Sequence, residues 1–260
     1  MREGEYPSIN VGLFFIIRNP VIKFRRLFSF AAMGRKNKLK RFAEVANFPN
    51  VFELTGGDQF FVSNGEGESR DMKGKWAGEY FKNNNPLILE LACGKGEYTL
   101  ALALRDPGHN FIGVDIKGAR IWKGARRGLE EKISNAAFLR TRIEFIEHYF
   151  APGEVESIWI TFPDPFEGKP NRRLTALPFL DRYRKILKPG GTINLKTDSE
   201  LLYEFTLEVI QSDPACELIY SNADIYNKPL YDPILEQKTF YELKHLAAGK
   251  KITYIKFTIS

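Results

Sequence analysis

A short apolar strand that runs directly into a glycine-rich turn constrains the fold of this chain more than any other feature. Residues 87–98 are L-I-L-E-L-A-C-G-K-G-E-Y, and a second apolar run, Phe111 to Val114, is followed by Asp115. This order of strand, Gly-x-Gly turn, helix, strand and acid is typical of α/β domains that hold a nucleoside-bearing cofactor. We expect Gly94 and Gly96 to let the backbone approach the cofactor. We expect Asp115 to accept hydrogen bonds from both ribose hydroxyls.

The same turn disfavours a dinucleotide cofactor. A pyrophosphate site uses G-x-G-x-x-G, whose third glycine packs the helix on the strand, and here Thr99 stands at that position. Glu90, on the strand before the turn, would be a poor neighbour for a pyrophosphate. It suits S-adenosylmethionine, which carries a sulfonium and an ammonium. The alternative is a solvated Glu90 beside an ordinary glycine turn, and a nicotinamide oxidoreductase is the least favoured function.

Composition bounds the class of protein and its compartment. The 260 residues, 43% of them hydrophobic, suit one large domain with appended elements, and the net charge of +6 favours a polyanionic partner. Cys93 and Cys216 are the only cysteines, without a metal-binding pattern, so we expect no metal and a reducing cytoplasm. The apolar run Val11 to Ile17 is too short to cross a bilayer, so we expect no membrane association.

The N-terminal region is strongly basic. Nine Lys and Arg residues and no acid occur between Arg18 and Arg41, which predicts a flexible arm that binds nucleic acid, with a solubilising tail as the alternative. We therefore divide the chain into an extension, 1–41, and a cofactor-binding α/β domain, 42–260. Because Met33 opens the most basic part, 1–32 could be an upstream extension from a misplaced start codon, or an amphipathic helix on a membrane surface.

Beyond the turn, strands and helices alternate. This alternation predicts an α/β fold with a doubly wound, mostly parallel seven-stranded sheet and helices on both faces, closed by an antiparallel pair at its end. We expect 64–78 to be a loop and the ordered core to begin near Pro86. Beyond the two strands already named, the expected strands are 136–139, 157–162, 192–195, 217–220 and 253–259, and the later helices are 117–133, 177–187 and 199–211.

Four acids stand at or near the carboxyl ends of the expected strands: Glu90, Asp115, Asp164 and Asp198. In an open α/β sheet, ligands bind outside these ends, so the four should lie along one rim. Each alone could instead be a helix cap or a turn residue.

The most specific short motif is Pro163-Asp164-Pro165-Phe166. Two prolines stiffen the loop and fix a carboxylate beside an aromatic ring. Such a ring can stack a base while the carboxylate accepts hydrogen bonds from guanine N1–H and the 2-amino group. Downstream cations suit phosphate contacts, or alternatively a solvated loop; they are Lys169, Arg172 and Arg173.

With these motifs, the sequence resembles the bacterial tRNA (guanine-N7-)-methyltransferase family. The resemblance covers about 33–260 and rests on E-L-A-C-G-K-G-E-Y, F-I-G-V-D-I-K-G-A-R, F-P-D-P-F…R-R-L-T, G-G-T-I-N-L-K-T-D and T-F-Y-E. It implies a class I methyltransferase fold with S-adenosylmethionine as cofactor, tRNA as partner and N7-methylguanosine in the variable loop as product. It also implies site residues: Glu90, Gly94, Gly96 and Asp115 for the cofactor, Asp164 for catalysis and the cofactor side, and Lys169, Asp198, Thr239 and Glu242 for the substrate.

The sequence departs from the family pattern at two places. The family usually has P-D-P-W-P-K, whereas Glu167 and Gly168 follow Phe166 here, so the assignment of Lys169 depends on the alignment. The acid expected at the end of the third strand, where the adenine binds, is replaced by Arg142, with Glu144 two residues on. The oligomeric state, monomer or homodimer, stays open.

The chemistry expected here needs little acid–base catalysis. Guanine N7 has a lone pair and no proton, so positioning and charge complementarity would be sufficient. We therefore interpret His109, His148 and His245 as structural or surface residues. Two other functions are compatible with the motifs: a methyltransferase for an exocyclic amine of a nucleic acid, and a tRNA-binding module without catalysis.

Overall fold

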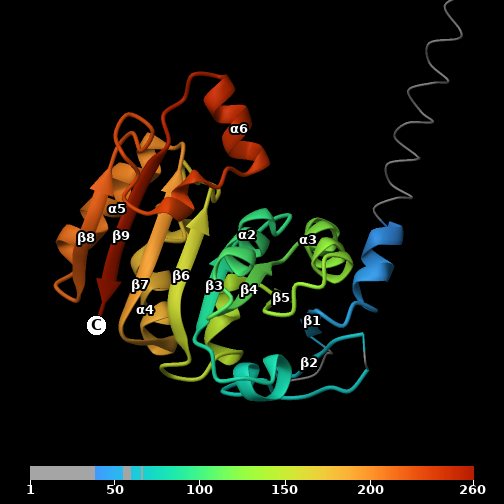
Figure 1. The fold of residues 1–260 in the computed structure, drawn as a ribbon. Helices are drawn as coiled ribbons and strands as arrows, with labels where there is room; N and C mark the ends of the chain where they lie inside the picture. Colours follow the sequence, from blue (N-terminus) through green and yellow to red (C-terminus); the bar gives the residue numbers. More distant parts are fainter. Residues whose placement is uncertain (1–38, 55–59, 66) are drawn as a thin grey trace, which may run out of the picture. The chain divides into compact units, whose positions relative to one another are not determined.

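A sheet of nine strands forms the centre of the computed structural model, which describes residues 39–54, 60–65 and 67–260 (Figure 1). Along the sheet the order is β2-β1-β5-β4-β3-β6-β7-β9-β8. The strands are β1 (Val51–Leu54), β2 (Val62–Ser63), β3 (Leu87–Leu91), β4 (Asn110–Asp115), β5 (Ala136–Arg140), β6 (Val155–Thr161), β7 (Leu187–Thr197), β8 (Cys216–Asn222) and β9 (Thr253–Ile259).

The order in which the chain adds strands reverses in the middle of the sheet. From β3 the chain moves outward through β4 to β5, then returns to β6 and β7 on the other side of β3, with all of these neighbours parallel. β9 pairs antiparallel with β7 and with β8. All seven predicted strands, β3 to β9, are present, and the predicted fold class is confirmed. The predicted number of strands is wrong, because β1 and β2 extend the sheet to nine. The reversal between β3 and β6 is the place where doubly wound folds bind ligands.

Two strands and a helix precede the region where we expected the core to begin, and that expectation is wrong. β1 pairs in parallel with β5, and β2 pairs antiparallel with β1. Trp76, at the start of the π-helix η1 (Trp76–Phe81), is fully buried and donates its indole N–H to the carbonyl of Tyr149 at 2.8 Å. Residues 76–78 thus belong to a helix and not to the predicted loop. The short β1 run carries too weak a period to be recognised without its partner strand.

Helices cover both faces of the sheet (Figure 1). They are α2 (Glu97–Arg105), α3 (Gly118–Glu130), α4 (Leu177–Ile186), α5 (Glu200–Ser212) and α6 (Phe240–Ala247), with 3-10 turns η2 (Ile143–His148), η3 (Pro170–Arg172) and η4 (Pro233–Glu236). Because side chains alternate along a strand, each face has its own apolar core. Leu89 and Leu91 pack with side chains of η1, α4 and α5, whereas Phe138 and Trp159 pack with α2 and α3.

Most of the predicted basic arm lies outside the described residues. Residues 39–45 are helical, and the guanidinium of Arg41 lies 4.8 Å from the centre of the Trp122 ring on α3. Within the described parts of the chain, no helix has the length and apolar character needed to cross a membrane.

Candidate functional site

A cavity of about 560 Å³ opens at the carboxyl ends of the central parallel strands. Its wall includes the residues that directly follow β3, β4, β5 and β6, among them Ala92, Ile116, Thr141 and Phe162. The cavity therefore lies across the point where the strand order reverses, as predicted. Its volume falls in the usual range of about 300–1,000 Å³ for small-molecule sites.

Asp115 is anchored at this cavity by the backbone around it. Its two carboxylate oxygens accept hydrogen bonds from the N–H of Gly94 at 3.0 Å and of Lys117 at 2.7 Å. The side chain is almost buried, yet it lines the cavity. Since each carboxylate oxygen has a second lone pair, the anchored group can still accept hydrogen bonds from a ligand.

The two glycines of the turn have different roles. Both have positive φ, 58° at Gly94 and 66° at Gly96. A Cβ at Gly96 would lie 2.4 Å from the ring of Phe138, so this glycine lets the turn pack against the sheet and α3. At Gly94 the nearest atom to such a Cβ is 3.9 Å away. Of the two, only Gly94 has the open space that a close ligand approach requires.

Glu90 lies beneath the cavity rather than in its wall. The side chain is buried, and one carboxylate oxygen accepts from both the backbone N–H and the hydroxyl of Thr99. The other oxygen accepts from the hydroxyl of Thr161 at 2.6 Å. Burial raises the pKa of Glu90 to about 7, although these hydrogen bonds oppose the shift. A cation bound above this carboxyl would favour its ionised form.

The loop after β6 carries Asp164 in an unusual backbone conformation. Phe162 and Phe166 have φ of 49° and 43°, a region that costs a non-glycine residue roughly 1–3 kcal/mol. Asp164 is exposed at the cavity and accepts a hydrogen bond from the N–H of Phe166 at 3.2 Å. Carboxylate and ring thus line the same cavity, as the motif predicts.

The three cations downstream of this loop separate in the structure. Lys169 is exposed and does not line the cavity, whereas Arg172 lines it and lies over the Phe166 ring. Arg173 is only 6% exposed and binds backbone carbonyls of the loop. The interpretation of Arg173 as a phosphate contact is therefore wrong, because a buried guanidinium cannot reach a phosphate on the surface.

The cavity also contains residues to which the sequence analysis assigned no role in the site. Arg142 and Glu144, which replace the expected acid, both line it and form an ion pair at 3.2 Å. Phe179 and Arg182 reach it from α4, a helix with no local signal of a site. Lys117 and Phe162 also line the cavity. Their positions just after β4 and β6 are the signal that could have found them, since residues that follow the carboxyl ends of these strands lie at this rim.

The remaining predicted residues lie away from this cavity. Asp198, after β7, forms an ion pair with Lys250 at 2.6 Å, and its carboxylate lies 3.2 Å from Nδ1 of His245. Thr239 and Glu242 are buried and cap α6 reciprocally, side chain to backbone. Glu242 also forms an ion pair with Lys196 at 2.8 Å, and both side chains have no exposed surface.

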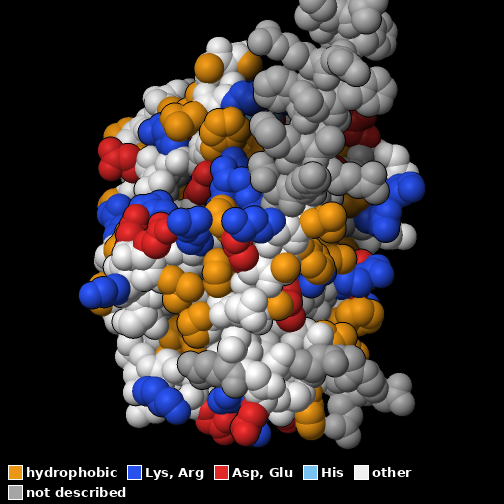
Figure 2. All heavy atoms as spheres, turned by 90° about the vertical axis from the view of Figure 1, so that its right-hand side faces the viewer, with side chains coloured by type: hydrophobic (Ala, Val, Ile, Leu, Met, Phe, Trp, Pro, Cys, Tyr) orange, Lys and Arg blue, Asp and Glu red, His pale blue; other side chains and the backbone are white. Residues whose placement is uncertain are grey.

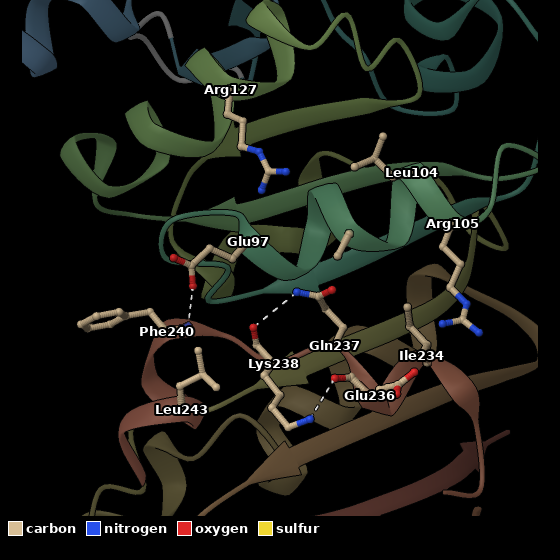
Figure 3. A pocket seen from close by; sticks show the side chains of 11 residues that line it. Glu97, Leu104, Arg105, Arg127, Ile234, Glu236, Gln237, Lys238, Phe240 and Leu243 are labelled. Carbon is tan, nitrogen blue, oxygen red and sulfur yellow. Dashed lines mark hydrogen bonds between the residues drawn. The ribbon is translucent and has the colours of Figure 1, made fainter. Parts of the chain in front are cut away.

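A second cavity, of about 790 Å³, lies between α2 and the segment 234–243 (Figure 3). Figure 3 shows Glu97 of α2 pointing toward Phe240, whose N–H donates to that carboxylate at 2.8 Å. Among the predicted site residues, none lines it. The first cavity is therefore the better candidate for the cofactor and the reacting base.

Two further observations concern the predictions about metal ligands and about the histidines. In the described residues no three His, Cys, Asp or Glu side chains are grouped so that they could hold a metal ion. His148 stacks on Phe60 with ring centres 3.8 Å apart, and Nδ1 of His109 lies 2.8 Å from the Asp106 carboxylate, in agreement with structural or surface roles.

The fold and the position of the cavity define the class of protein. The chain is similar in structure to the 16S rRNA methyltransferase KamB, with a TM-score of 0.54 and 12% identity over 74% of this chain and 96% of KamB. A 30S ribosomal A1408 methyltransferase from an uncultured bacterium gives a TM-score of 0.50 and 15% identity, over 74% and 97%. At such identities the likeness shows the fold alone, which is that of the class I, S-adenosylmethionine-dependent methyltransferases.

Sequence comparison shows the family. A family model described as "Putative methyltransferase" matches residues 84–255. The tRNA (guanine-N(7)-)-methyltransferase of Christiangramia forsetii is 48% identical over 87% of this chain and all of the relative, and that of Bacteroides thetaiotaomicron is 47% identical over 86% of each. The chain belongs to the tRNA (guanine-N7-)-methyltransferase family.

Proposed function

We propose that this protein transfers the methyl group of S-adenosylmethionine to N7 of a guanosine in the variable loop of tRNA. The observation that carries the proposal is the cavity at the strand reversal, which brings Asp115 and Asp164 together from the ends of β4 and β6. Family membership supports the same cofactor and substrate. The reaction requires no base, since guanine N7 carries a free lone pair.

The cavity suits the proposed cofactor. Asp115 is held with free lone pairs for the ribose, and the open space at Gly94 admits a ligand close to the backbone. Apolar walls from Ile116 and Ile143 can contact the adenine, with Glu144 as the nearest acid that could accept from its amino group. When bound, the cofactor supplies an electrophilic methyl on a sulfonium, a good leaving group.

Asp164 and Phe166 are assigned to the guanine. The Phe166 ring offers a stacking surface, and the exposed Asp164 carboxylate can accept from N1–H and the 2-amino group together. The same negative charge favours the sulfonium. The protein would thus act by holding the base in line with the methyl group in a site of matched charge.

We assign tRNA phosphate contacts to the cationic residues around the cavity and to the N-terminal arm, Arg18–Arg41. Around the cavity, Lys117, Arg120 and Arg172 line the wall. Figure 2 shows Lys and Arg side chains spread over one face of the molecule, with acidic ones between them. Lys169 is exposed in the same loop as Asp164. Asp198, Thr239 and Glu242 stay proposed as substrate-side residues, and His245 of their neighbourhood stacks on Phe162 of the cavity wall, with ring centres 6.2 Å apart. We place the protein in the cytoplasm, where tRNA is available.

The test is one incubation with labelled S-adenosylmethionine and unmodified tRNA, followed by nucleoside analysis and mapping of the labelled base. We expect N7-methylguanosine at one position of the variable loop. A methyl group on an exocyclic amine would instead support the alternative enzyme, and cofactor or tRNA binding without label would support a non-catalytic module. The Asp164→Asn protein is the matched control for label that does not depend on the site.

A further inference from the structure

Arg173 is a buried cation whose polar partners, within the described part of the chain, are backbone carbonyls and not carboxylates. Its Nε donates to the carbonyl of Pro165 at 2.9 Å, and its Nη2 donates to that of Glu167 at 3.5 Å. The side chain is 6% exposed. A buried charge without an acidic partner is costly, so the contacts that it makes instead call for an explanation.

Both hydrogen bonds go to residues of the loop that carries Asp164. The central carbon of the guanidinium lies over the Phe205 ring on α5, 4.4 Å from its centre, while Nε donates to the loop. Arg173 therefore connects a rigid helix to residues 165 and 167. Two prolines in the loop have no N–H, which leaves few internal hydrogen bonds to hold it.

The loop needs such support because its backbone is strained. Phe162 and Phe166, on either side of Asp164, both have positive φ. A non-glycine residue keeps this conformation only where its surroundings determine it. The hydrogen bond from Phe162 N–H to the Lys196 carbonyl fixes the start of the loop, and Arg173 is the side chain that fixes its end.

We infer that Arg173 is a positioning residue that holds Asp164 and Phe166 in the geometry required for methyl transfer. The inference rests on the proposed function of this site. Lysine cannot replace arginine here, because a single ammonium cannot stack on Phe205 and donate to two separated carbonyls at once. Arg173 acts through the loop and does not touch the substrate.

The experiment compares Arg173→Lys with Arg184→Lys. Arg184 serves as the control because its Nε also donates to a backbone carbonyl, that of Ser260, outside the loop, although Arg184 in addition pairs with Asp181 and Asp213. We expect Arg173→Lys to lower the turnover number at least about tenfold and to leave the dissociation constant of S-adenosylmethionine within about twofold, because Asp115 is untouched. Arg184→Lys should change thermal stability without a matching loss of turnover.

Hydrogen exchange gives a readout that does not depend on activity. Peptides covering 162–173 should exchange faster in Arg173→Lys than in the wild type, with the remaining peptides unchanged. If the wild type fails to methylate tRNA, the proposed function falls while the exchange experiment still tests the role of Arg173. Unchanged exchange in this loop, or wild-type turnover in Arg173→Lys, would overturn the inference, and so would a turnover loss fully explained by global unfolding.

Discussion

Two neighbouring parts of the strand rim contain the same kinds of residue in different states. At β4 and β6, Asp115 and Asp164 line an open cavity with their acceptor capacity partly free. At β7 and α6, Asp198 and Glu242 are bound to cations of the chain itself, Lys250 and Lys196. An acid after a strand is thus a site residue or a structural one according to its partners, which lie far away in sequence.

The ion pair between Lys196 and Glu242 belongs to a network that stabilises the structure around β7 and α6. Lys196 also donates to the carbonyls of Leu235 and Gln237, and Tyr226 donates its hydroxyl to Glu242 at 2.5 Å. Burial lowers the pKa of Lys196, and the Glu242 carboxylate opposes that shift. This network attaches the segment before α6 to the sheet.

The largest effect is expected where this buried pair is broken. Glu242→Gln leaves Lys196 charged and buried without a counter-ion, which should lower the free energy of unfolding by about 3–5 kcal/mol. Chemical denaturation measures it, with Glu236→Gln as control, an exposed acid of the same segment. A stable Glu242→Gln protein that has lost tRNA affinity would instead show that Glu242 serves the substrate.

Asp164→Asn should have the opposite effect to Glu242→Gln, with a large loss of activity and little loss of stability. Asp164 is exposed, and its hydrogen bond with the N–H of Phe166 is local, so the fold does not depend on its charge. The amide would present a donor to guanine N1–H and remove negative charge near the sulfonium. We expect turnover to fall about a hundredfold or more in single-turnover assays. Near-normal turnover in a folded protein would shift attention to Asp198.

Asp115→Ala should weaken cofactor binding without abolishing the fold. The variant loses charge-assisted hydrogen bonds to the ribose, each roughly 1.5–3 kcal/mol at most, and also the anchor on Gly94 and Lys117. Calorimetry with S-adenosylmethionine should show a dissociation constant raised at least about tenfold. An affinity within about twofold of the wild type would contradict the assignment of Asp115 to the ribose.

Glu90→Gln should change how stability depends on pH. The pKa of Glu90 rises from 4.5 to about 7 on burial, so the folded protein holds this proton more tightly than the unfolded chain does. The free energy of unfolding should therefore fall as pH rises through this window, by at most roughly 1.4 kcal/mol per unit, and level off above it. Glutamine removes this contribution. Denaturant unfolding of both proteins at several pH values measures it, and parallel curves would show that Glu90 does not titrate there.

The smallest effect is expected for Asp198→Asn. Its partners Lys250 and His245 are partly exposed, and such ion pairs contribute about 0–1 kcal/mol. Thermal unfolding should barely change, and lower salt should enlarge the difference. A clear loss of methyl transfer at unchanged stability would instead show that Asp198 serves the substrate.

Much of the fold could be predicted because its signals are local. The turn at Gly94 and the helix cap at Ser199 follow from neighbouring residues, and the alternation of strands and helices then limits the topology. β1 was missed because a four-residue strand gains its stability from β5, more than eighty residues away in sequence. Likewise, nothing near Phe179 indicates that α4 reaches the cavity.

The sequence by itself determined the class of fold, the cofactor turn and the rim on which acids gather, since backbone period and glycine geometry are properties of short segments. Only the tertiary structure decided which of those residues is free to bind a ligand. It placed Gly96 against Phe138, buried Glu90 beneath the cavity, paired Glu242 with Lys196 and turned Arg173 inward. Burial and charge pairing depend on atoms brought together from distant parts of the chain, and these set the state of each ionisable group.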